Sequence, residues 1–358
     1  MQYVNSAPYP QYAQGYQQSP QQSKKNLDIR TVKKKSSGLG FYILAYFMTM
    51  FVIEFIMIFV LSFSLMMNMD VTNIDTETLI YEVTKQLTSG PIFYYSQILA
   101  ATSSAVVPGL IYLKLSKTHI SESLIVKPVK PTMLIALTLM GMGVAMVSNV
   151  AANLLSSNFS SIGIDYNLDM DASSSSVFEN ILYVIAVALT PAFAEEFAFR
   201  GILMGTLKKY GNSFAIITSA VMFGGMHGNI IQIPFAFILG LVFAYIDCKT
   251  NSIIPSIIIH FINNFYSVMM DIIRSQSMLT TRSFYILYYS LFVGMLVLGI
   301  LAFLYIMKKD KNFLSISDTS QLISLSLKEK VKCFFLNPGV ITIVSIFILE
   351  TIYTAVIL

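Results

Sequence analysis

The residues best suited to chemistry in this chain lie inside segments that are otherwise apolar. They form three clusters along the sequence: Glu195, Glu196 and Arg200; then His227; then His260 and Asn264. An ionisable group inside a hydrocarbon layer costs roughly 3 kcal/mol or more unless it is paired or hydrated. Two of the chain's three histidines belong to this set. Together the clusters indicate a buried active site.

The two adjacent glutamates are expected to do different things. Successive residues of an α-helix point about 100° apart, so one carboxylate can face a cavity while the other braces it. Arg200 follows Glu196 by four residues, the spacing at which an acid and a cation pair on one helix face. Glu195 is then the freer carboxylate and the candidate general base. The alternative is that Glu196 and Arg200 form a buried ion pair that only fixes helix packing.

The histidines allow two readings of the chemistry. His227 and Glu195 could hold and activate one water molecule, or they could join His260 as a two-histidine, one-carboxylate set on a zinc ion. His260 and Asn264 share a helix face and could instead donate hydrogen bonds to a tetrahedral oxyanion, while Asn263 lies one residue round. Either reading describes hydrolysis of an amide inside a membrane cavity.

The composition predicts a polytopic membrane protein. Of the 358 residues 55% are hydrophobic and only 12% are charged, which is too apolar for an ordinary soluble domain. No segment shows the alternating pattern of a membrane β-barrel, so the spans should be helices and the fold an all-α transmembrane bundle of about eight or nine spans. The expected spans are residues 39–66, 91–113, 132–156, 177–199, 213–229, 231–247, 253–272, 284–307 and 338–358.

The positions of the site residues within these spans raise a conflict. Pro191 is expected to break the fourth span four residues before Glu195, near its cytoplasmic end. The fifth span ends in a glycine-rich turn that contains His227. If the fifth span crosses the membrane fully, His227 lies toward the external side, far from Glu195. A short, tilted fifth span would remove the conflict.

Charge and composition divide the chain into four parts. Residues 1–37 are rich in Gln, Tyr and Pro and predict a disordered cytoplasmic tail; residues 38–175 hold N-terminal spans, 176–272 the catalytic core and 273–358 C-terminal spans. Lysines and arginines flank alternate spans, so we expect a cytoplasmic N-terminus and an external C-terminus. The basic runs therefore predict topology and no nucleic-acid partner.

Other polar residues receive structural predictions. Neither Cys248 nor Cys333 has a CxxC partner or a metal-ligand neighbour, so we expect no disulfide. Glu54 and Glu350 are isolated intramembrane acids, for which packing or snorkelling is expected.

At these positions the sequence resembles the CAAX protease and bacteriocin-processing family of intramembrane endopeptidases, also called the Abi family. The family's motifs are EExxxR, FxxxH and HxxxN. Here they read Glu195-Glu196-Phe197-Ala198-Phe199-Arg200, Phe223-Gly224-Gly225-Met226-His227 and His260-Phe261-Ile262-Asn263-Asn264. Three motifs in the right order on successive spans make the resemblance specific.

The resemblance implies an α-helical intramembrane protease with a conical cavity. In that family pattern Glu195 is the general base, His227 helps it hold the attacking water, and His260 with Asn264 stabilises the oxyanion. Glu196 and Arg200 support the helix. Members are often described as metalloproteases, yet a glutamate mechanism needs no cofactor. We therefore expect no metal, with zinc on Glu195, His227 and His260 as the alternative.

The expected partners are a peptide or protein substrate at the membrane and the lipid bilayer. The composition looks prokaryotic, which predicts a bacterial plasma membrane. Bacterial members of the family are associated with bacteriocin self-immunity, peptide maturation or scaffolding of other membrane proteins. The alternative function is a non-catalytic membrane partner or transporter in which the same residues line a proton or solute path. Neither inverted repeats nor paired broken helices are evident to favour a transporter.

Overall fold

The structure, a computed structural model, describes residues 19–68, 77–78, 80–81, 85, 90–161, 176–318 and 324–357. Within these residues the chain is helical and has no strand, which confirms the predicted all-α fold. Eight of the described helices are long and apolar enough to cross a membrane. They are α1 (Pro20–Asn68), α3 (Gly90–Leu115), α5 (Pro131–Ser160), a composite helix (Val177–Tyr210), α10 (Gln232–Thr250), α11 (Ile254–Ser275), α12 (Thr281–Lys309) and α14 (Pro338–Ile357). Shorter helices are α4 (Ile120–Ser123), α9 (Asn212–Gly225) and α13 (Leu327–Phe335).

Helix α1 begins at Pro20, and proline is a favoured residue in the first turn of a helix. The prediction of a disordered tail over residues 1–37 is therefore wrong from Pro20 onward, and its first 18 residues lie outside the described chain. The first turns of α1 pack on α13, where Lys25 Nζ lies 2.6 Å from Glu329 Oε1. Tertiary contact stabilises a helix that the local composition did not predict.

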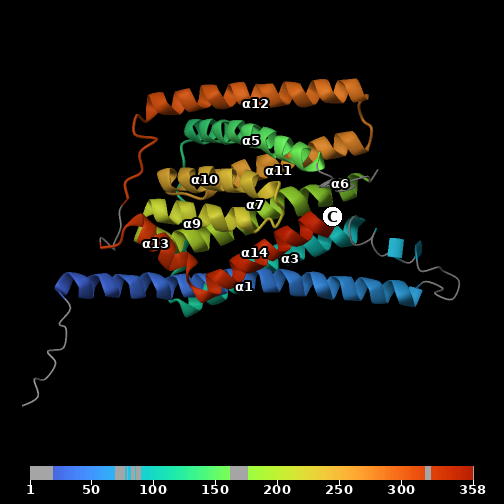
Figure 1. The fold of residues 1–358 in the computed structure, drawn as a ribbon. Helices are drawn as coiled ribbons and strands as arrows, with labels where there is room; N and C mark the ends of the chain where they lie inside the picture. Colours follow the sequence, from blue (N-terminus) through green and yellow to red (C-terminus); the bar gives the residue numbers. More distant parts are fainter. Residues whose placement is uncertain are drawn as a thin grey trace, which may run out of the picture.

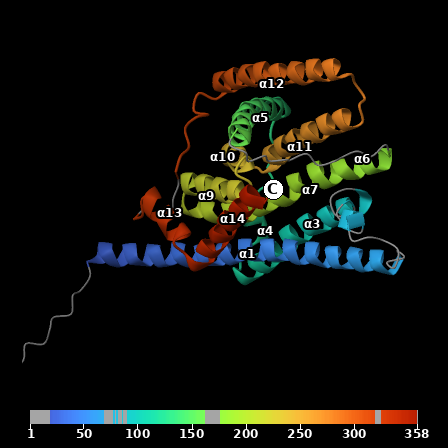
Figure 2. The same ribbon diagram turned by 45° about the vertical axis from the view of Figure 1, so that its right-hand side comes forward.

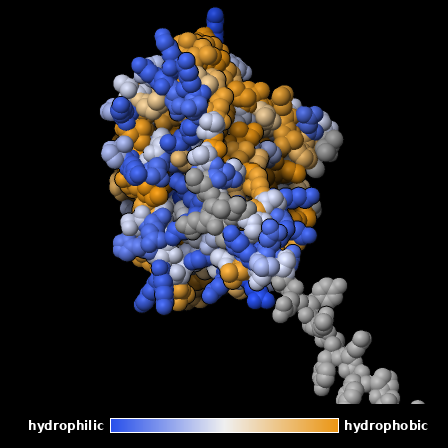
Figure 3. Space-filling view, turned by 90° about the vertical axis from the view of Figure 1, so that its left-hand side faces the viewer, coloured by the Kyte–Doolittle hydropathy of each residue, from blue (hydrophilic) through white to orange (hydrophobic). Residues whose placement is uncertain are grey.

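The helices run side by side, and lysines gather at one end of the bundle, the left side of Figure 1. We call this the basic end; α1 begins there, and α3, α10 and α12 end there. Lys209 Nζ lies 2.7 Å from Glu122 Oε2, and Lys249 Nζ donates to the carbonyl of Asn312 at 2.8 Å. Figure 3 looks onto this end, where many hydrophilic residues gather. The pattern is that of a membrane protein with one strongly basic face.

Helices α9 and α10 form a hairpin whose turn lies inside the bundle (Figure 1). The 14 residues of α9 rise about 21 Å, less than the ~30 Å of a hydrocarbon core. The predicted full crossing over 213–229 is therefore wrong, and His227 lies at mid-depth, without the conflict with Glu195. A Cβ on Gly224 would lie 2.9 Å from Phe237 Cβ, so glycine lets the two helices approach closely.

The composite helix changes its winding around the glutamates. Helix α6 (Val177–Val184) leads into a π-helical segment, η1 (Ile185–Leu189), and α7 (Thr190–Glu196) leads into a second, η2 (Phe197–Met204). A short α-helix, α8 (Gly205–Leu207), and a 3₁₀ turn, η3 (Lys208–Tyr210), complete the composite helix. Segments of π-helix occur often at functional sites, because each one shifts the facing of the side chains that follow. Here they bracket the turn that carries Glu195.

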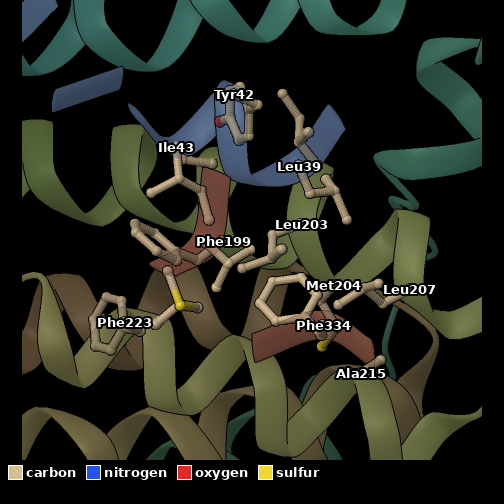
Figure 4. Close-up of a cluster of buried hydrophobic side chains, with 14 of the residues drawn as sticks. Leu39, Tyr42, Ile43, Phe199, Leu203, Met204, Leu207, Ala215, Phe223 and Phe334 are labelled. Carbon is tan, nitrogen blue, oxygen red and sulfur yellow. The ribbon is translucent and has the colours of Figure 1, made fainter. Parts of the chain in front are cut away.

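A cluster of buried side chains fixes the composite helix to its neighbours. Figure 4 shows side chains of α1, η2, α9 and α13 meeting there, and nine of its ten labelled residues are at most 3% exposed, among them Leu39, Phe199, Leu203, Phe223 and Phe334. Lipid tails are as apolar as these side chains, so close packing rather than exclusion from water holds the cluster. Its effect is to seat α9 against the segment that carries Arg200.

Candidate active site

One cavity contains the residues that the sequence singled out as catalytic. Its volume is about 280 Å³, and its walls come from η1, α7, α9, α10 and α11. Glu195, His227, His260 and Asn264 all line it. Gln232, Asn263 and Ser267 add polar groups, and the other lining residues are apolar. The cavity is therefore a small polar site in an apolar surround.

The two glutamates point to different partners, as their 100° offset predicts. Glu196 is fully buried; its Oε2 lies 3.2 Å from Arg200 Nε, and its Oε1 accepts a hydrogen bond from His260 Nδ1 at 2.9 Å. Glu195 lines the cavity, and no described residue donates a hydrogen bond to its buried Oε2. The predicted pair of Glu196 and Arg200 is confirmed, and the other carboxylate faces the cavity.

Arg200 is held from three sides. It is 1% exposed, and its Nη2 donates to the carbonyl of Gly240 at 3.4 Å. The guanidinium carbon lies 4.1 Å from the centre of the Phe223 ring and 5.4 Å from that of Phe243. The attraction between a cation and an aromatic face is stronger when the pair is shielded from water. Arg200 thus ties α10 and α9 to the helix that carries the glutamates.

His227 occupies the turn after α9, and its tautomer follows from its partner. Its Nδ1 lies 2.9 Å from the carbonyl oxygen of Phe223, one helical turn earlier. A carbonyl can only accept a hydrogen bond, so Nδ1 carries the proton and Nε2 keeps its lone pair. The Phe223 ring packs edge-on against both His227 and His260, at 5.2 and 5.9 Å between centroids. The phenylalanine of the FxxxH motif therefore separates and orients the two imidazoles.

His260 lies between the two glutamates. Its Nδ1 donates to Glu196, and its Nε2 lies 3.9 Å from Glu195 Oε2. A carboxylate on one imidazole nitrogen fixes which nitrogen carries the proton and how the ring is oriented. Glu196 therefore positions His260 as well as Arg200, a role that the sequence did not indicate.

The composite helix continues through Pro191 and is not broken there, but Pro191 accounts for the partner of Asn264. Proline has no N–H to donate to the carbonyl of Val187, four residues earlier. Asn264 Nδ2 donates to that carbonyl at 3.3 Å, and its Oδ1 accepts from Asn263 Nδ2 at 3.2 Å. One N–H of the Asn264 amide remains for the cavity. Asn263, which the sequence placed one residue round, lines the same cavity and is 5% exposed.

Three contributors to the site were missed from the sequence. Asp247 is 1% exposed next to the Glu196 and Arg200 pair and accepts a hydrogen bond from Ser256 Oγ at 2.7 Å. An isolated acid within an apolar span was the signal that could have found it. The others are Gln232 and Ser267, which nothing in the sequence distinguishes from ordinary polar residues.

Helix α14 contacts the turn that carries His227. Thr354 Oγ1 donates to the carbonyl of Gly228 at 2.9 Å, and a Cβ on Gly228 would lie 2.5 Å from the carboxyl carbon of Glu350. Gly228 has φ +57°, a conformation that glycine adopts without strain. Glu350 is isolated in sequence, but in space it packs on the residue next to His227.

The zinc alternative can be tested against the donor atoms. The proposed ligands would be Glu195, His227 and His260. In the part of the chain that the structure describes, no three His, Cys, Asp or Glu side chains converge as a metal site. His260 Nε2 and Glu195 Oε2, which would be two of the three zinc ligands, are 3.9 Å apart. The absence of a metal ion stays a prediction.

Comparison with known families gives one match. Residues 177–266 match the family described as type II CAAX prenyl endopeptidase Rce1-like. The matched segment is about a quarter of the chain and contains all six residues of the three clusters. No curated protein and no solved structure gives a significant match. The resemblance carried by the three motifs is confirmed over this segment, which is similar to the type II CAAX prenyl endopeptidases.

Proposed function

We propose that this chain is an intramembrane endopeptidase that hydrolyses a peptide bond of a membrane-associated peptide or protein without a metal ion. The observation that carries the proposal is the single cavity lined by Glu195, His227, His260 and Asn264. The match to a family of CAAX endopeptidases over 177–266 supports the reaction class. For the substrate we propose the wider class of membrane-associated peptides.

In this mechanism Glu195 takes a proton from the attacking water. Its Oε2 has no hydrogen-bond donor among the described residues, so the carboxylate is free to accept one from a water molecule. The Nε2 lone pair of His227 provides a second acceptor on the α9 side of the cavity, because its proton is held at Nδ1. Two acceptors orient the water oxygen so that its own lone pair faces the substrate carbonyl.

The developing oxyanion would be stabilised from α11. With Nδ1 bound to Glu196, a protonated His260 presents its Nε2–H toward Glu195 and the cavity. Asn264 adds its remaining N–H, on the same helix face one turn later. Donors fixed in a site that excludes water stabilise the transition state more than mobile ones do. The Glu195 proton then passes to the leaving amine.

For the membrane orientation, we propose that the basic end faces the cytoplasm. The lysines in the first turns of α1 and at the ends of α3 and α12 lie there, and short segments rich in Lys and Arg are retained inside. Because α1 begins and α14 ends at opposite ends of the bundle, this gives a cytoplasmic N-terminus and an external C-terminus. A bacterial plasma membrane is the proposed location.

The deciding experiment compares cells that carry wild-type protein, Glu195→Gln and Glu179→Gln. Both substitutions remove one carboxylate charge, but Glu179 lies at the start of the composite helix and does not line the cavity. We expect released peptides and processed membrane proteins to disappear in Glu195→Gln and to persist in Glu179→Gln, at equal amounts of folded protein. Unchanged processing in Glu195→Gln would contradict the protease, and a phenotype without any change in cleavage would favour the non-catalytic alternative.

A further inference from the structure

A second cavity, apart from the active site, lies on the lipid-facing flank of α5, α10 and α12. Its volume is about 560 Å³, within the range of small-molecule sites. We call it the flank groove; its walls include Val144, Val147, Val242, Ile300 and Phe303. Figure 2 shows α5 between α12 and α10, so the groove has α5 as its floor.

The groove exists because one flank of this helix trio is left uncovered. Helix α11 packs on α5, α10 and α12, yet no α11 residue lines the groove. At the floor Gly143 and Gly299 meet closely: a Cβ on Gly143 would lie 3.0 Å from Gly299 Cα. The missing side chains let α12 approach α5 and leave a hollow beside the contact.

No polar group in the groove is free. All lining residues are apolar except Tyr245, whose hydroxyl donates to the carbonyl of Phe313. A polar or charged ligand would lose its hydrogen bonds to water in such a site, at a cost of several kcal/mol. A hydrocarbon chain loses none. The groove therefore suits an acyl chain.

The groove is closed at the basic end of the bundle. After α12 the chain folds back over α10, where Lys249 Nζ donates to the carbonyls of Asn312 and Ser315. Phe313 and Leu314 of this segment form the end wall. Lys311, two residues before Phe313, is exposed at this end, and so is Lys309, whose Nζ lies over the ring of Tyr305. An acyl chain seated here would have its headgroup among these lysines.

From this geometry we infer that the flank groove binds one anionic phospholipid of the bilayer, with an acyl chain between α10 and α12 and the phosphate against Lys309 and Lys311. The inference is independent of the proposed protease. It adds a bound lipid to a face of α10 next to the one that lines the active site, since Val242 lines the groove while Leu239 and Phe243 line the catalytic cavity.

The test measures lipid retained by the purified full-length chain in native mass spectrometry. The probes are palmitoyl-oleoyl phosphatidylglycerol, which is anionic, and palmitoyl-oleoyl phosphatidylcholine, which is neutral overall. We expect one phosphatidylglycerol per chain, retained about 25-fold more strongly than phosphatidylcholine, since two lysines would each contribute roughly fivefold. A lysine near an anionic lipid contributes roughly fivefold, so Lys309→Gln with Lys311→Gln should weaken this preference about 25-fold at low salt. The pair Lys114→Gln with Lys117→Gln, also exposed at the basic end but on α3 and the turn after it, should leave it unchanged.

Groove-filling variants separate the site from general lipid contact. Ile300 is 60% exposed and lines the groove, whereas its neighbour Leu301 is 56% exposed and does not. Ile300→Trp should reduce retention of phosphatidylglycerol about tenfold, and Leu301→Trp should change it less than twofold. Val147→Phe, on the α5 wall and also 60% exposed, provides a second filling variant.

Three results would overturn the inference. The first is equal retention of the two lipids, and the second is equal retention of phosphatidylglycerol by Ile300→Trp, Leu301→Trp and wild type. The third is a dimer that Ile300→Trp dissociates, which would assign the groove to a second copy of the chain. None of these readouts depends on peptide cleavage, so failure here leaves the proposed protease untouched.

Discussion

Removing Arg200 should destabilise this protein more than most single substitutions. The guanidinium is 1% exposed and its Nε lies 3.2 Å from Oε2 of Glu196, which is fully buried. Truncation to alanine leaves the Glu196 carboxylate with the imidazole of His260 but without its cation. It also removes the cation from the faces of the Phe223 and Phe243 rings. Breaking a buried ion pair from one side typically costs ~3–5 kcal/mol.

The assay is the free energy of unfolding in mixed lipid and detergent micelles, taken from the fraction folded against increasing denaturant. We expect Arg200→Ala to lose about 3–5 kcal/mol, and Arg200→Lys to recover only part of it, because an ammonium cannot reproduce the planar guanidinium between two rings. Abundance in the membrane should fall in the same order. Stability comparable to wild type for Arg200→Ala, within about 1 kcal/mol, would refute the reasoning.

A double-mutant cycle shows whether charge is the cause. Arg200→Met with Glu196→Gln removes both charges and keeps similar volumes, and replacing a whole buried pair by neutral groups is often close to neutral in stability. The double variant should therefore be more stable than Arg200→Met alone, with a coupling energy of roughly 1–3 kcal/mol. Additive losses would mean that Arg200 stabilises the bundle through packing on the rings, independent of Glu196.

Three further outcomes are expected. His227→Ala should lower cleavage about 10²-fold with little loss of folded protein, because it removes one of the two acceptors that orient the attacking water and the residue fills a turn rather than a core; full activity would remove it from the mechanism. Purified protein should keep peptidase activity after exhaustive chelation and contain far less than one equivalent of zinc by elemental analysis; stoichiometric zinc whose return restores lost cleavage would overturn the metal-free mechanism. Gly228→Ala should cost roughly 1–3 kcal/mol, because φ is +57° and a Cβ would lie 2.5 Å from the Glu350 carboxyl carbon. The matched change Gly294→Ala, in the interior of α12 with nothing within 4 Å, should instead stabilise by about 0.5–1 kcal/mol, and equal effects of the two would contradict the argument.

The fold class could be predicted because a bilayer imposes simple rules on the sequence. Backbone groups must be paired within lipid, so apolar runs of sufficient length become helices, and α14 (Pro338–Ile357) follows the predicted span over 338–358 closely. The rules fail where an apolar helix does not cross. Hydropathy cannot distinguish the 14-residue α9 from the start of a span, since the glycine turn that ends it is also apolar. Only the contact of α9 with α10 decides that the chain turns back.

The site was predicted in its residues but only partly in its connections. Spacing on one helix predicted the contact of Glu196 with Arg200, because i and i+4 residues are neighbours. The hydrogen bond between His260 and Glu196 joins residues 64 positions apart, and no pattern within one helix encodes it. The hydrogen bond from Asn264 to the Val187 carbonyl also joins residues far apart in sequence. Pro191 does indicate from the sequence that this carbonyl lacks its usual helical donor, but it does not indicate which residue replaces that donor.

Helices outside the matched segment also help to shape the active site, which explains why the family motifs alone do not define it. Helix α14 contacts the His227 turn at three successive positions of one face: Phe347 packs on Gly225, Glu350 on Gly228, and Thr354 donates to the Gly228 carbonyl. These positions are three and four residues apart, so one rigid helix face holds both sides of the turn. The Nδ1 bond to Phe223 fixes the tautomer of His227, and α14 fixes where that imidazole lies in the membrane. The glycines of this turn let α10 and α14 approach closely, but glycine also allows the backbone many conformations. A histidine in such a turn therefore needs both constraints to keep one position.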